Sequence, residues 1–188
     1  RQKAGKKLVA AAHKILGTLS MAQCRLEVAL EPRDNPAPHP HGCEDVVFLI
    51  STNPGAAPQP LGKIASGGEL SRVSLAIQVV TASAGTVPSM VFDEVDVGIG
   101  GAVAEVVGKL LRDLAARAQV LCVTHLPQVA AQGHQHLQVS KTADKKTVET
   151  SLRALDEEGK VAEIARMLGG VKITEQTLAH AREMLACN

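Results

Sequence analysis

Two adjacent carboxylates, Asp93 and Glu94, come directly after a short apolar segment, residues 89–92. An apolar run of this length is typical of a buried strand, which would leave both carboxylates at the carboxyl edge of a parallel sheet, where open α/β folds bind ligands. Carboxylates at such an edge suit a magnesium ion and can polarise an attacking water. An isolated acidic pair after a strand is more often a solvated turn, so its meaning depends on the rest of the chain.

A serine, two glycines and a glutamate occupy positions 66–69, within the string SGGELSR at 66–72. Ser66 and Glu69 are spaced as a capping box at the start of a helix. The glycines allow another molecule to approach the backbone, and the free N–H groups of a helix start favour an anion. For a generic S-x-x-E, a well-capped helix after a glycine-containing loop is the more common interpretation.

A histidine, His125, follows a second apolar segment at 120–123. Apolar segments alternate with amphipathic stretches, which predicts that this segment is also a buried strand of a parallel sheet covered on both faces. A lone histidine at a strand end is usually a structural hydrogen-bonding group. The order of the three features along the chain therefore carries more information than any of them alone.

The full string at 66–72 resembles the signature motif of the ABC ATPase superfamily, including its SMC-like branch. In that family a Walker B segment and a switch histidine follow in the order seen here. Longer strings at 61–72, 91–101 and 123–131, and a tail at 163–185, resemble the RecN family of bacterial double-strand-break repair ATPases. The resemblance covers nearly the whole chain and is poorest at 31–45.

The resemblance implies a role for each of these residues. In the family two heads enclose two ATP molecules, and each signature motif completes the site of the other head. The residues that would contact the γ-phosphate of ATP on the other head are Ser66, Gly67, Gly68 and Glu69. On the chain's own side, Asp93 would hold Mg²⁺ through water, and Glu94 and His125 would be catalytic.

Asp96 departs from the family pattern. Many ABC and SMC proteins place an aspartate a few residues beyond the Walker B glutamate, but this chain has VGIGG at 97–101. Asp96 is the nearest carboxylate and lies closer to Glu94 than that aspartate usually does, so the sequence leaves its role open.

The chain has no recognisable phosphate-binding P-loop. The nearest string, residues 55–64, has glycines that are too far apart, two prolines that lack amide donors, and Ile64 where a hydroxyl is needed. No Gly-Lys-Ser or Gly-Lys-Thr occurs elsewhere. In the family an N-terminal half supplies the Walker A motif, so that half is the expected first partner.

The expected architecture is an α/β fold, the C-terminal lobe of an ABC-type ATPase head. We expect a mostly parallel sheet flanked by helices, a closing β-hairpin, and two C-terminal helices. Residues 1–20 form a helix whose apolar stripe is typical either of an ordinary amphipathic helix or of the end of a coiled coil, and the resemblance favours the coiled coil. Residues 21–188 would form the half-head.

Composition limits the function classes. The formal net charge is +1 and only two residues are aromatic, both Phe, which argues against nucleic-acid binding by bulk charge or by base stacking. No apolar run is long enough for a membrane span, no secretion signal is visible, and the four cysteines form no CxxC pair. We therefore expect no membrane partner and a cytoplasmic, nucleoid-associated protein.

The sequence thus predicts an SMC-like head that hydrolyses ATP to ADP and phosphate with Mg²⁺ in DNA repair. Its partners would be the N-terminal half of the same protein, a second head in a homodimer, and DNA. One alternative is a non-catalytic half-head that only dimerises, since the chain alone lacks a Walker A motif. Another is a subunit of an ABC transporter, although transporter signatures usually continue with QR rather than SR.

Overall fold

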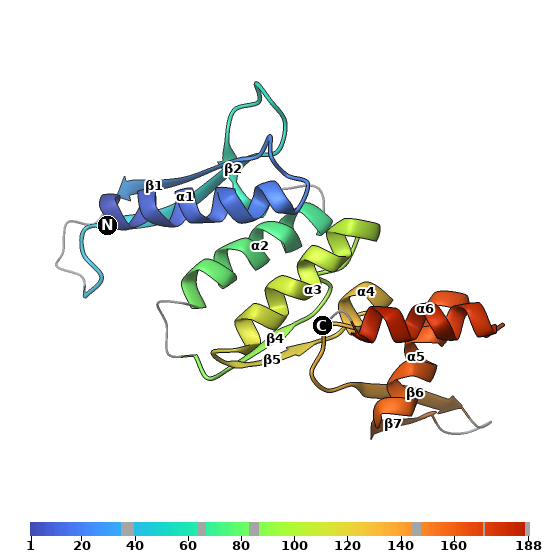
Figure 1. The fold of residues 1–188 in the computed structure, drawn as a ribbon. Helices are drawn as coiled ribbons and strands as arrows, with labels where there is room; N and C mark the ends of the chain where they lie inside the picture. Colours follow the sequence, from blue (N-terminus) through green and yellow to red (C-terminus); the bar gives the residue numbers. More distant parts are fainter. Residues whose placement is uncertain (35–39, 64–66, 83–86, 144–147, 171, 187–188) are drawn as a thin grey trace. The chain divides into compact units, whose positions relative to one another are not determined.

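The computed structural model describes residues 1–34, 40–63, 67–82, 87–143, 148–170 and 172–186. Its contacts divide the chain into two units. The first comprises Arg1–Met90 with Val97–Ile99, and the second comprises Val91–Asp96 with Gly100–Asn188. Each unit is described by itself below (Figure 1).

The first unit packs two helices with a small antiparallel sheet. Strands pair in the order β1-β2-β3, and α1 lies against both β1 and α2. Its elements are α1 (Gln2–Thr18), β1 (Arg25–Pro32), β2 (Glu44–Ser51), β3 (Gln59–Pro60), the 3₁₀ helix η1 (Leu61–Lys63) and α2 (Gly67–Ala82).

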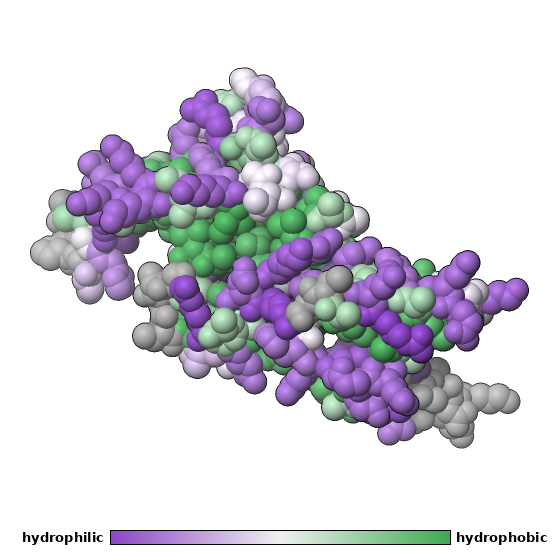
Figure 2. All heavy atoms as spheres, in the orientation of Figure 1, coloured by the Kyte–Doolittle hydropathy of each residue, from purple (hydrophilic) through white to green (hydrophobic). Residues whose placement is uncertain are grey.

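Aliphatic side chains from both layers form the core of this unit. Ala12 and Leu16 on α1 are buried, because their spacing of four residues puts them on one helical face. Leu26 of β1 is buried directly opposite Ile50 of β2. A hydrogen bond of 2.9 Å from the Leu26 N–H to His13 Nε2 ties the strand to the helix. In Figure 2 hydrophilic residues lie over α1, whereas hydrophobic residues are visible along α2.

The second unit begins within β4 (Ser89–Phe92) and is built around a β-α-β arrangement. Strand β4 pairs in parallel with β5 (Gln119–Cys122), and α3 (Gly101–Ala115) connects them. The α3 residues Ala104, Val107, Leu111 and Leu114 repeat every three or four positions and are buried.

Helix α4 (Pro127–Ala130) follows β5 and packs closely on α3. A Cβ atom added at Gly108 of α3 would lie 2.6 Å from Gln132 Cγ, so this close approach requires glycine. The Arg112 guanidinium donates to the Gln132 carbonyl oxygen at 2.6 Å and closes the same contact.

A hairpin and two helices complete this unit. They are β6 (Leu137–Ala143), β7 (Val148–Ala154), α5 (Glu157–Gly169) and α6 (Glu175–Ala186). The buried Glu163 of α5 accepts hydrogen bonds from Gln138 of β6 and from Arg166. Thr174 caps α6, because its hydroxyl oxygen accepts a hydrogen bond from the Thr177 N–H.

The β4–β5 pair differs from the expectation of a sheet covered on both faces. Val91, Leu121 and Val123 are 70%, 42% and 60% exposed, while Phe92 on the opposite face is 3% exposed. Successive side chains of a strand point to opposite faces, so one apolar face of this pair is uncovered in this chain. No helix among the described residues is long and apolar enough to cross a membrane.

Candidate active site

The segment that follows β4 alternates between solvent and core. Asp93 and Glu94 are exposed, whereas Val95 and Asp96 are 5% and 2% exposed. The buried Val95 therefore anchors a turn whose preceding carboxylates face solvent. This is the placement that the sequence predicts for the acidic pair.

Glu94 has a backbone conformation that is unusual for its type. Its φ of 56° lies in the left-handed region, which among described non-glycine residues is shared only by Ser20. Such a conformation costs about 1–3 kcal/mol and is found mainly where function requires it. The strain marks Glu94 as the residue of this turn whose placement matters most.

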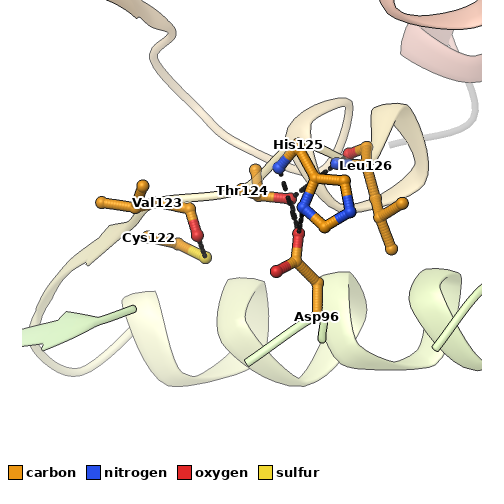
Figure 3. Close-up of polar contacts among 6 residues, drawn as sticks. All are labelled: Asp96, Cys122, Val123, Thr124, His125 and Leu126. Atoms are coloured by element: carbon orange, nitrogen blue, oxygen red, sulfur yellow. Dashed lines mark hydrogen bonds and ion pairs between the residues drawn. The ribbon is translucent and has the colours of Figure 1, made fainter. Parts of the chain in front are cut away.

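The ends of β4 and β5 bring the acidic segment and the histidine together. The Val123 N–H donates to the Phe92 carbonyl oxygen at 2.9 Å, so the backbones of β4 and β5 remain paired to the ends of the two strands. Just beyond, Oδ2 of Asp96 accepts hydrogen bonds from Thr124 Oγ1 at 2.5 Å and from the His125 N–H at 3.1 Å (Figure 3). The same oxygen lies 3.3 Å from His125 Nδ1.

Carboxylates make this corner of the unit electronegative. The pKa of the Cys122 thiol is raised to about 11, first by burial and then by the negative charges of Asp96 and Asp93. The part of this shift that comes from the two carboxylates is a negative field, which attracts a cation, whereas burial disfavours charge of either sign.

The signature-like residues lie in the other unit. Gly67 and Gly68 begin α2, and Glu69 is in its first turn. Ser66, and with it the expected capping box, lies outside the described residues. A Cβ added at Gly68 would be 2.6 Å from the Val97 carbonyl oxygen, whereas one added at Gly67 would have no atom within 4 Å. One glycine is thus required by packing and the other faces open space.

Sequence reasoning places Asp93, Glu94 and His125 correctly at two neighbouring strand ends, but it misses the contact that joins them. Asp96 bridges the two strand ends, and the sequence analysis leaves its role open. The residues at 93–96 hold no local signal for this contact, because it depends on the path of the chain after β5.

Comparison with known proteins shows which proteins this chain is similar to. No family model matches the chain. The DNA repair protein RecN of Xylella fastidiosa (strain Temecula1) is 51% identical over 185 residues, which are 98% of this chain and 33% of the relative. RecN of Vibrio cholerae is 54% identical over 167 residues, 89% of this chain and 30% of the relative. The chain thus spans about a third of the length of these curated relatives.

Solved structures show the same fold at much lower sequence identity. The Smc head domain with a coiled coil and joint from Pyrococcus yayanosii matches with a TM-score of 0.63 and 17% identity, over 85% of this chain and 28% of that one. The Smc head domain from Pyrococcus furiosus, bound to the C-terminal domain of ScpA, matches with a TM-score of 0.59 and 16% identity, over 88% and 39%. The resemblance indicated by the motifs is therefore confirmed: over nearly its whole length this chain is related to about a third of the RecN DNA repair proteins, and its fold is that of an SMC ATPase head.

Proposed function

We propose that the chain is the C-terminal lobe of an SMC-like ATPase head that serves DNA repair, and that its reaction is hydrolysis of ATP to ADP and phosphate. The observation that carries the proposal is the contact of Asp96 with His125, which joins the segment after β4, where Asp93 and Glu94 lie, to the end of β5. Exposed carboxylates and an exposed imidazole that follow neighbouring parallel strands can act on a bound phosphate and its attacking water.

Glu94 and His125 would be the catalytic side chains. The Glu94 carboxylate is exposed and can accept a hydrogen bond from the attacking water, orienting and polarising it. The His125 side chain is 72% exposed, so its ring can reach a phosphate oxygen that lies outside the unit.

Asp93 would hold Mg²⁺ through water. Mg²⁺ usually takes one or two protein carboxylates together with substrate phosphates and waters, and Asp93 is an exposed carboxylate that could serve as one of them. The electronegative environment of Cys122, to which Asp93 contributes, supports a cation here. When bound, the ion would neutralise charge on the phosphates.

The signature residues would act on ATP held by a second head. Gly67 leaves open space at the start of α2, where the helix dipole favours an anion. Ser66, Gly68 and Glu69 would complete this contact, as the family resemblance implies. A homodimer of heads would then contain two such composite sites.

A second lobe would supply the Walker A motif and cover the bare face of the β4–β5 pair. The apolar Val91, Leu121 and Val123 are the kind of surface that a parallel sheet buries. Residues Gln59–Pro60, within the rejected P-loop string, pair with β2 as strand β3 and do not form a phosphate loop. We propose the N-terminal half of the same protein as this lobe, with α1 leading to it as the end of a coiled coil.

DNA repair comes to this chain from the names of its RecN relatives. We propose DNA as the partner whose binding the ATP cycle controls, and the nucleoid in the cytoplasm as the location. The transporter alternative loses support because the relatives that match are RecN proteins.

The remaining alternative is a half-head that dimerises without turning over ATP. Two measurements separate it from the proposed ATPase. Calorimetry of the chain alone with Mg-ATP should detect weak binding or none, because most β- and γ-phosphate donors would come from the other lobe. The chain joined to a Walker A lobe should hydrolyse ATP, and Glu94→Gln should abolish that turnover. A joined head that binds ATP and never hydrolyses it would establish the non-catalytic alternative.

A further inference from the structure

Asp96 is a buried carboxylate to which the proposed function assigns no role. Its side chain is only 3% exposed, and the described residues with buried charged side chains are Asp96 and Glu163. A carboxylate in such a position is stable only when hydrogen bonds compensate the lost hydration. All three donors that Asp96 meets come from two residues of the β5–α4 connection, Thr124 and His125.

The contact with Nδ1 determines which ring nitrogen of His125 is available. A carboxylate oxygen 3.3 Å from Nδ1 favours a proton on that nitrogen, since the alternative tautomer would place two acceptors together. Nε2 is then the free end of a ring that is 72% exposed. Figure 3 shows the ring turned with one nitrogen toward Asp96.

The backbone on either side of the ring is held by the same group. Oδ2 of Asp96 also accepts from the His125 N–H, and Thr124 Oγ1, which donates to Asp96, accepts from the Leu126 N–H at 3.0 Å. One buried oxygen therefore fixes both the position of the loop and the rotation of the ring. A purely structural carboxylate would need only the loop contacts.

We propose that Asp96 is a positioning residue of the ATPase, which holds the Nδ1–H tautomer of His125 and directs Nε2 to the γ-phosphate of ATP. The inference rests on the proposed function, since it assigns His125 to that phosphate. When the ring is neutral, Nε2 accepts a hydrogen bond from a water at the γ-phosphate; when the ring is protonated, Nε2–H donates to a phosphate oxygen. In both states the buried anion stabilises the orientation.

The test compares Asp96→Asn with Glu163→Gln. The asparagine keeps an acceptor for the His125 N–H but removes the negative charge that faces Nδ1. Glu163→Gln removes the other buried carboxylate, whose partners are Gln138 and Arg166, and serves as the control for a general loss of stability.

The first readout is the tautomer of His125, measured at pH 8 by long-range ¹H–¹⁵N NMR on ¹⁵N-histidine-labelled protein. Its signals are identified by their loss in His125→Gln. Wild type and Glu163→Gln should carry the proton on Nδ1, and Asp96→Asn should lose that preference. An Nε2–H tautomer in the wild type overturns the proposal even if Asp96→Asn does not fold.

The second readout is ATP turnover by the complete head. Asp96→Asn should lower kcat about tenfold to hundredfold, as loss of the group behind a working histidine does at metal sites, with the KM for ATP within about twofold. Asp96→Asn should cost little further activity in a His125→Gln background, because its effect passes through His125. Unchanged kcat in Asp96→Asn, or full additivity with His125→Gln, overturns the proposal.

A failure of the proposed function is distinguishable from a failure of this inference. A wild-type complete head without ATPase activity refutes the function, and with it the role of Asp96 at the γ-phosphate. An active wild type whose Asp96→Asn variant keeps its rate refutes the role of Asp96 alone.

Discussion

Gly68 approaches Val97 backbone to backbone: a Cβ atom on Gly68 would lie 2.6 Å from the Val97 carbonyl oxygen. The first turn of α2 is thereby placed against the segment that follows Glu94 in the chain. Gly67, its neighbour, has open space where a Cβ would be. The two glycines of the signature-like string are therefore not equivalent.

This difference predicts opposite effects of two alanine substitutions. Gly68→Ala should destabilise the protein by about 1–3 kcal/mol, since a backbone carbonyl has to move to admit the new methyl group. Gly67→Ala should leave stability unchanged or raise it by up to about 1 kcal/mol, because alanine is the better helix former. Urea denaturation of both variants measures the difference, and equal losses would contradict the packing of Gly68 on Val97.

The same pair tests the contact with ATP across two heads. If the start of α2 binds a γ-phosphate, Gly67→Ala should lower ATP turnover of the complete head several-fold while the protein remains fully stable. Steady-state ATPase assays on protein of verified stability measure this effect. Normal turnover in Gly67→Ala would favour the plainer interpretation, a capped helix with no ligand.

Glu94→Gln should retain ATP binding and lose turnover by at least about 100-fold, because the amide cannot polarise or deprotonate water. ATP-bound head dimers should accumulate, which light scattering after gel filtration would detect. Glu105→Gln is the matched control, since Glu105 is an exposed glutamate on α3 paired with Lys109. Turnover near the wild-type rate in Glu94→Gln would assign the base to another residue.

Glu163 should contribute to stability in a pH-dependent way. Hydrogen bonds from Arg166 lower the pKa of Glu163 from 4.5, so its contribution is fully present above pH 4.5 and is lost as the pH falls through the folded-state value. Burial lowers the pKa of His136 from 6.5. Its contribution to stability is therefore also lost as the pH falls, and this loss begins at about pH 6.5, above the range in which Glu163 acts. In urea denaturation, the stability of the wild type should exceed that of Glu163→Gln at pH 7, and the gap should close as the pH falls below 4.5. A gap that widens in acid would contradict the ion pair.

The thiols should differ in reactivity. Since the pKa of Cys122 is raised to about 11, almost no thiolate is present at pH 8, whereas Cys43 is exposed. Iodoacetamide should therefore modify Cys43 at least about tenfold faster than Cys122, as peptide mass spectrometry can measure. Asp96→Asn should speed the labelling of Cys122, because it removes one of the charges that raise this pKa. An unchanged Cys122 labelling rate in Asp96→Asn would contradict the contribution of the Asp96 charge.

Elements with a strong periodic pattern could be predicted from the sequence. The helix expected at 1–20 is α1 (Gln2–Thr18), and the strand expected at 89–92 is β4. Strand β3 and helix η1 could not be predicted, because they lie in the segment 52–65, whose three prolines indicate a loop. The pairing of β3 is set by the edge of β2, which no local pattern reveals.

The site was predictable in its parts but not in its connection. Asp93, Glu94 and His125 follow apolar runs, and parallel strands bring such positions to one edge. The burial of Asp96 depends on where the chain goes after β5, and so does its contact with His125. The different surroundings of Gly67 and Gly68 depend on the position of the Val97 carbonyl. Both are tertiary relationships between residues that are distant in the chain.

The bare face of β4–β5 has a consequence for work in solution. With Val91 and Val123 more than half exposed, the chain expressed without a covering lobe should bind hydrophobic dyes and associate with itself through this face. A dimer of that kind would form without nucleotide and dissociate in mild detergent. It would be easily mistaken for the ATP-dependent pairing of heads, so that pairing has to be measured on the complete head, in which this face is covered.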